Sequence, residues 1–255
     1  MATIQDYPFK YEMHLHTSEA SKCGSNTGAE MARAHKEAGY AGIFVTNHAW
    51  GGNTCIDREL PYREWIEQYA QGYYNALEEG EKIGLQVFFG MEAGFSGTEF
   101  LIYGVTPEWM ADHEELWDAD IPEQYRIIHG GGGIVMHAHP FREEWYIPEI
   151  RLFPDCVDGI EMINATHSSH LSKAHNDPKY DERAIEYARK YNMPTCAGSD
   201  VHSTNVFGGG IMCRKRIKSD RELIDLILSK GDYILTNGDD YFTKDGVKIH
   251  GEFNI

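Results

Sequence analysis

The segment Tyr11-Glu12-Met13-His14-Leu15-His16 decides how this chain folds. Its apolar residues predict a short strand, and alternate side chains of a strand point to the same face. His14 and His16 therefore leave the strand end toward one point, as two ligands of one metal ion must. The segment predicts a strand whose end forms part of a metal site.

The same arrangement recurs along the chain. Each time a short apolar run is followed by residues that can bind a metal ion. A lone histidine is more often a surface residue, but chance does not explain five such groups at five strand ends. If the strands are parallel, their carboxyl ends meet at one edge of the sheet and the groups converge. The four further groups are Asn47-His48, Glu92, His137-Ala138-His139-Pro140 and Gly198-Ser199-Asp200-Val201-His202.

Helix signals alternate with these strands. Capping-box patterns at 27–30 and 219–222 predict helices that end near Gly39 and Gly231. About seven strand and helix repeats predict a parallel sheet closed into a barrel, with its site at the carboxyl ends of the strands. Weak periodicity predicts loops over the site at 49–60 and 164–179. Further helical patterns cover 61–84, 107–117, 122–129 and 181–191.

Composition limits the class of protein. The 255 residues are 42% hydrophobic and contain no linker-like stretch, which favours a single domain over 1–255. A net charge of -17 argues against nucleic acid as the main partner and against an anionic membrane surface. Five widely spaced cysteines without a CxxC pattern indicate neither a disulfide framework nor a thiolate zinc site. With no leader-like or membrane-spanning run, we expect a cytoplasmic location.

The ordered motifs resemble those of the PHP (polymerase and histidinol phosphatase) metal-dependent phosphoesterases. The resemblance extends over nearly the whole chain. It implies a distorted (β/α)7 TIM-like barrel that holds two or three divalent ions at the carboxyl ends of its strands. The motifs are His14-Leu15-His16-Thr17, Thr46-Asn47-His48, Gly90-Met91-Glu92, His139-Pro140 and Gly198-Ser199-Asp200-Val201-His202.

The resemblance also implies how the ligands are shared. Glu92 would bridge a first and a second ion, and His139 with a histidine of the 164–175 loop would complete the second. His48 and His202 would bind a third ion. For the loop ligand we favour His167, which is nearest the expected strand 159–163, with His170 and His175 as alternatives. The ligands implied for the first ion are His14, His16, Glu92 and Asp200.

Two positions depart from the family pattern. Many members place a histidine six residues after the second histidine of HxHT, or an aspartate one residue earlier, where this chain has Ser21-Lys22. Glu19 could replace that ligand, or the Lys22 ammonium could take the cation's place and bind a substrate phosphate. Asn47 stands where the family has aspartate. It can keep a hydrogen bond but loses a charge that raises histidine basicity.

The ligand types predict the chemistry. Histidine and carboxylate without thiolate suit Zn²⁺, Mn²⁺, Fe²⁺ or Co²⁺. Two such ions can activate a water and neutralise the leaving oxygen, so no protein nucleophile is needed. Arg142, three residues after His139, is the leading candidate to bind phosphate. His137 is either a supporting partner or a proton donor to the leaving group. The basic run 214–218 is read as a solvated face unless it lies at the barrel mouth.

Three functions remain open from the residues. The first is a phosphoesterase for a small phosphorylated metabolite or nucleotide, with phosphomonoesters favoured. The second is a metal-dependent amide hydrolase or deaminase, and the third is a non-catalytic metal-binding module. The Gly-Ser-Asp-x-His and His-Pro motifs favour the first, and the nearly complete ligand set argues against the third. Aromatic residues of the 49–60 loop could stack on a substrate ring. The expected catalytic residues are Glu92, Asp200, His202 and His137.

Overall fold

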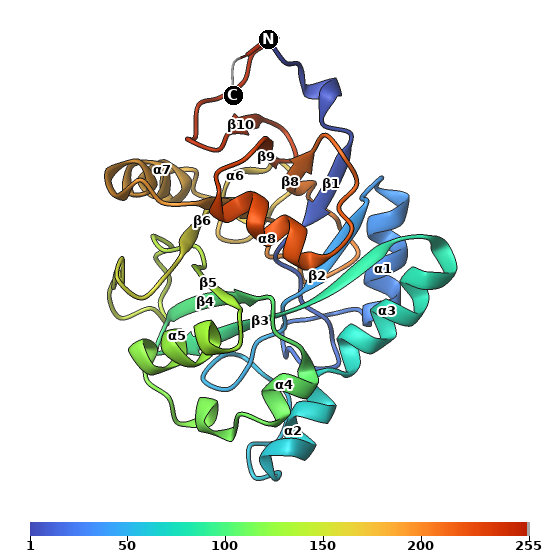
Figure 1. The fold of residues 1–255 in the computed structure, drawn as a ribbon, viewed down its shortest axis with the longest axis vertical. Coiled ribbons are helices and arrows are strands. Elements are labelled where there is room, and N and C mark those ends of the chain that lie inside the picture. Colours follow the sequence, from blue (N-terminus) through green and yellow to red (C-terminus); the bar gives the residue numbers. More distant parts are fainter. Residues whose placement is uncertain (254–255) are drawn as a thin grey trace.

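The computed structural model describes residues 1–253 as an α/β fold around one curled, mixed sheet (Figure 1). The ten strands lie in the order β10-β9-β8-β1-β2-β3-β4-β5-β6-β7. The strands are β1 (Phe9–Glu12), β2 (Gly42–Val45), β3 (Gln86–Phe95), β4 (Thr98–Tyr103), β5 (Ile134–His137), β6 (Gly159–Asn164), β7 (Thr195–Gly198), β8 (Gly209–Cys213), β9 (Tyr233–Asn237) and β10 (Tyr241–Thr243). The helices are α1 (Gly28–Glu37), α2 (Tyr62–Tyr69), α3 (Gln71–Ile83), α4 (Pro107–Ala111), α5 (Ile121–Gly130), α6 (Ala165–Ser168), α7 (Lys179–Tyr191) and α8 (Asp220–Leu228), with 3₁₀ turns at Ile4–Asp6 and Glu114–Trp117.

The expectation of a wholly parallel sheet is wrong. Strands β1, β2 and β3 are parallel, as are β5, β6 and β7, but β4 runs antiparallel between β3 and β5. Ser96 and Gly97 both have positive φ, 52° and 86°, which suits the tight turn of a hairpin. Strands β8, β9 and β10 are also antiparallel to their neighbours. Strands β7 and β10 form the two edges of the sheet, and a bridge between Leu15 and Val201 brings the segments after β1 and β7 together.

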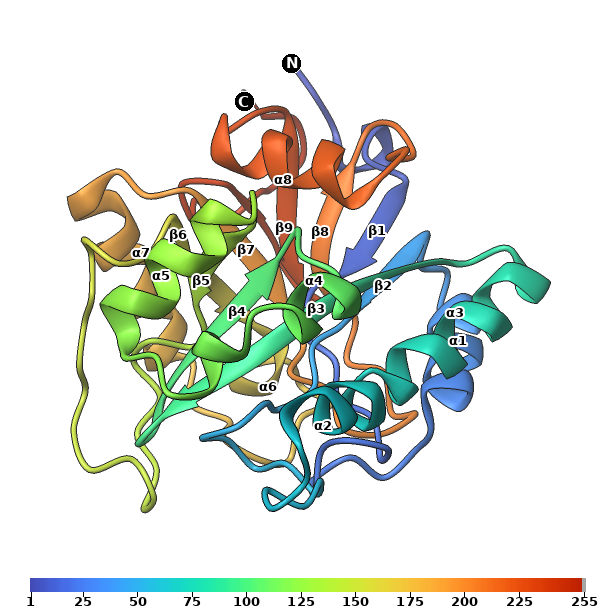
Figure 2. The same ribbon diagram turned by 60° about the horizontal axis from the view of Figure 1, so that its bottom comes forward.

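The helices cover the outside of the curled sheet (Figure 2). Helices α1 and α3 lie side by side on one flank, and α5 and α7 lie on the other (Figures 1 and 2). The helix starts at Thr27 and Ser219 are confirmed, because the side chain of each accepts a hydrogen bond from the third helical residue. The helix expected over 61–84 divides at Ala70 into α2 and α3, and α6 forms inside the expected 164–179 loop.

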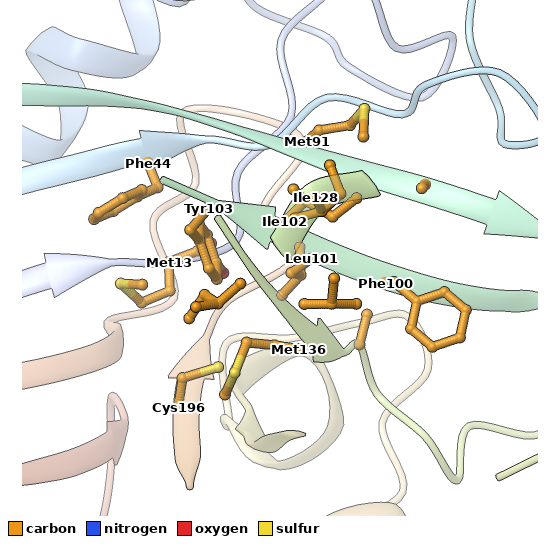
Figure 3. Packing of buried hydrophobic residues seen from close by; sticks show 14 of the residues in the cluster. Met13, Phe44, Met91, Phe100, Leu101, Ile102, Tyr103, Ile128, Met136 and Cys196 are labelled. Atoms are coloured by element: carbon orange, nitrogen blue, oxygen red, sulfur yellow. The ribbon is translucent and has the colours of Figure 1, made fainter. Parts of the chain in front are cut away.

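The main hydrophobic core joins residues of the strands with residues of the helices that pack on them (Figure 3). Phe44 and Tyr103 pack edge to face, with their ring centroids 5.1 Å apart, and the Tyr103 hydroxyl donates to the Met13 carbonyl at 2.7 Å. That bond ties Met13, which follows β1 and precedes His14 in the chain, to β4. The core thus supports the strand ends from which the candidate ligands project.

The loop at 49–60 is confirmed, but its aromatic residue has a structural role. Trp50 is buried against Trp65 and Trp117, with ring centroids 5.5 Å away in each case. It therefore anchors the loop and is not free to stack on a substrate. None of the helices in the described residues is long and apolar enough to cross a membrane.

Candidate metal centre

The predicted ligand groups converge, and Glu92 of β3 lies at their centre. Its Oε1 is 3.1 Å from the Nε2 atoms of both His14 and His139. Its Oε2 is 2.7 Å from Nδ1 of His48 and 3.4 Å from Nε2 of His16. One buried carboxylate thus contacts imidazoles that follow three different strands, β1, β2 and β5, as a bridging ligand would.

Asp200 forms the second carboxylate of the cluster. Its Oδ1 is 3.2 Å from Nε2 of His16 and 3.5 Å from Nε2 of His14, and His202 Nε2 lies 3.6 Å away. Its Oδ2 forms an ion pair with the Arg142 guanidinium at 2.6 Å. The segment after β7 therefore meets the segment after β1, as the motifs predict.

Buried partners orient the two histidines that follow β1. Nδ1 of His14 is 3.0 Å from a carboxylate oxygen of Glu161, so it carries the proton and leaves Nε2 free to bind a metal. Nδ1 of His16 is 3.1 Å from the Ser21 hydroxyl, which itself donates to Oδ1 of Asn47 at 3.0 Å. Asn47 thus keeps the hydrogen-bonding role expected of it, acting on His16 through Ser21.

The backbone is strained at two of these residues. His139 and Asp200 have φ values of 27° and 53°, in the left-handed region that side chains other than glycine rarely adopt. The Glu161 carboxylate holds the backbone of His139 in this conformation, because it accepts a hydrogen bond from the His139 amide at 3.0 Å. Such strain persists only where surrounding contacts enforce it, and it is often found at functional sites.

Two acidic residues of the site were not predicted from the sequence. Glu99 of β4 lies 3.5 to 3.6 Å from nitrogens of His139 and His48, and burial, with the charge of Glu92, raises its pKa to about 7. Because β4 runs antiparallel, its start lies at the edge where the parallel strands end. Glu161 lies within β6, where the alternation of the strand turns it inward. A charged residue in an otherwise apolar strand is the sequence signal that could have identified both Glu99 and Glu161.

The cluster forms the floor of a cavity of about 730 Å³. Arg142, nearly fully buried, lines this cavity beside Asp200. At the rim are Tyr146 and Trp145, of which Trp145 is 92% exposed. The cavity is large enough for a substrate of metabolite or nucleotide size, and its floor offers metal-binding groups next to a guanidinium.

The floor of the cavity fits divalent cations. Several buried nitrogen and oxygen atoms crowd together there without a hydrogen bond of normal geometry, although buried polar atoms normally form one. Four groups of three side chains have ligand atoms within 4.8 Å of one another, as metal coordination requires. These atoms are Nε2 of His14, Nε2 of His16, Nδ1 of His48 and Oε2 of Glu92.

The pKa shifts in the cluster also indicate a site for divalent cations. Burial disfavours ionised Glu92, but the charges of His14 and His48 outweigh it and hold its pKa well below the ordinary value. Burial likewise disfavours the protonated forms of His14 and His48. The negative charge of Glu92 outweighs this effect of burial and raises the pKa values of both histidines well above normal. In the metal-free protein, protons on these two imidazoles thus balance the negative charge of Glu92, which a bound metal ion would otherwise balance.

We therefore expect metal binding to release protons. His14 and His48, with raised pKa values, are protonated near neutral pH and must lose the proton to bind a metal, so metal affinity should rise with pH. Titration calorimetry of Zn²⁺ binding at pH 7, in buffers of different ionisation enthalpy, measures the protons released. His129→Ala, a change at an imidazole paired with Asp158 away from the cavity, is the control. A heat independent of the buffer contradicts the prediction.

The structure corrects the expectations for Lys22 and Glu19. Lys22 is exposed and is not part of the cavity wall, whereas the next residue, Cys23, is. The Lys22 backbone amide donates to the Asn53 carbonyl at 2.9 Å, and the Lys22 side chain points outward. Glu19 accepts from the Gly28 amide at the start of α1, at 2.9 and 3.1 Å, so neither side chain replaces the missing ligand.

His137 does not face the cavity either. It is 2% exposed, stacks on Phe100 with ring centroids 5.0 Å apart, and is absent from the cavity wall. Burial, together with the charges of His139 and Arg151, lowers its pKa to about 3. Of the two roles that the sequence left open for His137, this position suits a supporting partner better than a proton donor.

The three loop histidines have different surroundings. His167 is buried, with Nδ1 2.8 Å from Asp181, and its Nε2 accepts from Nε of Arg142 at 3.1 Å. It lies near His139 but positions Arg142 and is outside the four ligand groups. His170 is exposed and pairs with Asp239. His175 reaches the cavity wall but pairs with Glu144.

The basic run at 214–218 lies at the other end of the sheet. Cys213, at the end of β8, pairs with Phe9 at the start of β1, far from the end that carries His14. Arg214 forms an ion pair with Asp232, and Arg216 donates to Gln86. The run is therefore a solvated face and does not extend the anion site.

Comparison with known proteins agrees with the geometry. Residues 178–227, which include Asp200 and His202, match the model of a family described as PHP-associated. A two-domain protein from Bacteroides vulgatus, containing a predicted PHP-like metal-dependent phosphoesterase, aligns with 92% of this chain and 67% of its own, at 16% identity and a TM-score of 0.67. This chain has a PHP-like fold.

Other solved structures are similar to this chain at lower TM-scores. A protein from Bifidobacterium adolescentis described as a candidate metal-dependent phosphoesterase aligns over 87% of this chain and 96% of its own, with 16% identity and a TM-score of 0.53. An amidohydrolase from Chromobacterium violaceum has 16% identity over 76% of this chain and 87% of its own. Its TM-score of 0.47 is too low to support the amide hydrolase alternative. No curated protein matches the sequence.

Proposed function

We propose that this protein is a metal-dependent phosphoesterase that hydrolyses a small phosphorylated metabolite or nucleotide, with phosphomonoesters preferred. The observation that carries the proposal is the position of Arg142. Its guanidinium is buried beside Asp200, at the floor of the cavity that also holds the metal-binding cluster. A fixed cation next to such a cluster suits an anionic substrate, even in a chain of net charge -17.

The residues of the cluster would divide among the ions much as the resemblance implies, without a histidine of the 164–175 loop. Glu92 would bridge the first and second positions, and His139 would belong to the second, to which Glu99 would add a carboxylate that the motifs do not include. When bound, the divalent ions, Zn²⁺, Mn²⁺ or Fe²⁺, supply Lewis acidity to a phosphoryl oxygen and acidify the attacking water. The first position would use His14, His16, Glu92 and Asp200.

The chain's own residues bind and orient the substrate. Arg142 contacts the phosphate oxygens, and a chain of two hydrogen-bonded side chains, His167 and Asp181, fixes its direction from behind. Tyr146 and Trp145 offer aromatic surface at the rim to the group that carries the phosphate. This arrangement favours a phosphate at the floor and a ring or sugar at the rim.

A panel of phosphomonoesters, phosphodiesters, amides and aminated bases tests the proposal. We expect protein stripped with chelator and reloaded with Mn²⁺, Zn²⁺ or Fe²⁺ to hydrolyse a phosphomonoester faster than the matching diester. Asp200→Asn, which removes one ligand charge with little change in shape, is the background control. Release of ammonia or an amine without release of phosphate would favour the amide hydrolase alternative. Turnover of no substrate above the Asp200→Asn background would favour a non-catalytic module.

A further inference from the structure

Cys23 lies in the loop between β1 and α1 and faces the metal-binding cavity. The loop is pinned to the segment 53–55 by a bridge between Ser21 and Thr54 and by the bond from the Lys22 amide to Asn53. Lys22 and Cys23 are the central residues of a turn, which a hydrogen bond from the Gly24 amide to the Ser21 carbonyl closes at 3.0 Å. With Lys22 turned to solvent, Cys23 is turned to the cavity wall.

The Cys23 thiol contacts two imidazoles of the cluster. Cys23 lines the cavity together with His48 and His202, which follow β2 and β7, and its thiol lies next to both imidazoles. The ligand nitrogens of these two histidines and of His16 lie within 4.8 Å of one another. Nε2 of His16 is buried without a hydrogen-bond partner. The Cys23 thiol and the imidazoles of His48 and His202 line one cavity.

We propose that Cys23, as a thiolate, binds a divalent transition-metal ion together with His48 and His202. Thiolate is a soft ligand, so this position selects Zn²⁺, Co²⁺ or Fe²⁺ over Mg²⁺ and Mn²⁺. Cys23 then occupies the place left open at Ser21-Lys22, one residue later in the chain. The thiol loses its proton as the metal binds, and no oxidant or reductant is needed.

The inference rests on the proposed function for the neighbouring ions, but its test requires no turnover. The full chain is stripped with chelator and titrated with Co²⁺, and the near-ultraviolet band of thiolate-to-cobalt charge transfer is recorded. We expect the band in wild type and in Cys55→Ser, a change at the nearby exposed cysteine. We expect it to vanish in Cys23→Ser, with one Co²⁺ fewer bound per chain. No band in wild type, or an unchanged band in Cys23→Ser, overturns the proposal.

A second measurement on the wild-type chain does not depend on the folding of a variant. Alkylation by iodoacetamide is followed separately at Cys23 and Cys55 by peptide mapping, with and without Zn²⁺. A metal-bound thiolate is protected, so Zn²⁺ should slow alkylation of Cys23 by tenfold or more and leave Cys55 unchanged. Equal rates at Cys23 with and without Zn²⁺ overturn the proposal. If the Co²⁺ band and the protection are found but no phosphoester is hydrolysed, the proposed function fails and the Cys23 position stands.

Discussion

Glu92→Gln is expected to lower kcat for phosphoester hydrolysis by about 10³-fold or more, because the loss of a bridging ligand removes several kcal/mol of charge stabilisation. Glu92 is the side chain that contacts imidazoles following β1, β2 and β5. Glutamine preserves its shape and removes its charge. Metal analysis of the same sample should show fewer bound ions than in wild type.

The matched control is Glu78→Gln, which removes an exposed carboxylate on α3 that pairs with Lys82. It should leave kcat and metal content unchanged, because surface ion pairs contribute little. Circular dichroism of both variants checks that the fold is retained. Wild-type turnover in Glu92→Gln would remove this carboxylate from the catalytic centre.

Gly28→Ala is expected to destabilise the fold by about 3 kcal/mol, because overpacking a tight contact forces backbone shifts. Gly28 begins α1 where it crosses α3, and an added Cβ would lie 2.0 Å from the Gly72 carbonyl oxygen. The two helices would have to move apart. Thermal unfolding should show a melting temperature lower by roughly 6 to 12 °C.

Gly130→Ala provides the control for this change. Gly130 ends α5 and is also a helical glycine, but an added Cβ there has no atom within 4 Å. Alanine should be neutral or stabilise by up to about 1 kcal/mol, because it restricts the unfolded chain. Equal melting temperatures for Gly28→Ala and wild type would show that the helix crossing adapts without cost.

The metal-binding cluster could be predicted because its signals are local. An apolar run sets the direction of a strand, and residues just past its end share one edge of the sheet. His14, His16, His48, His139 and Asp200 meet for this reason. The helix starts at Thr27 and Ser219 could also be predicted from the sequence, because a capping side chain accepts a hydrogen bond from a backbone amide of the first turn.

The antiparallel hairpin β3–β4 was not foreseen, and Glu99 was missed with it. A strand that runs in the opposite direction brings its start, not its end, to the site, so the rule used for the other ligands does not find it. Lys22 and Cys23 show a similar limit. They are neighbours in the chain, and a hydrogen bond from the Lys22 amide to the distant Asn53 accompanies the outward turn of Lys22.

The sequence by itself determined the strand ends, most of the cluster and the kind of chemistry, because each depends on residues close together in the chain. Tertiary structure alone decided that His137 lies behind the wall, that His167 supports Arg142, and that Cys23 lines the cavity. Each of these depends on contacts between segments far apart in sequence. No local pattern carries that information.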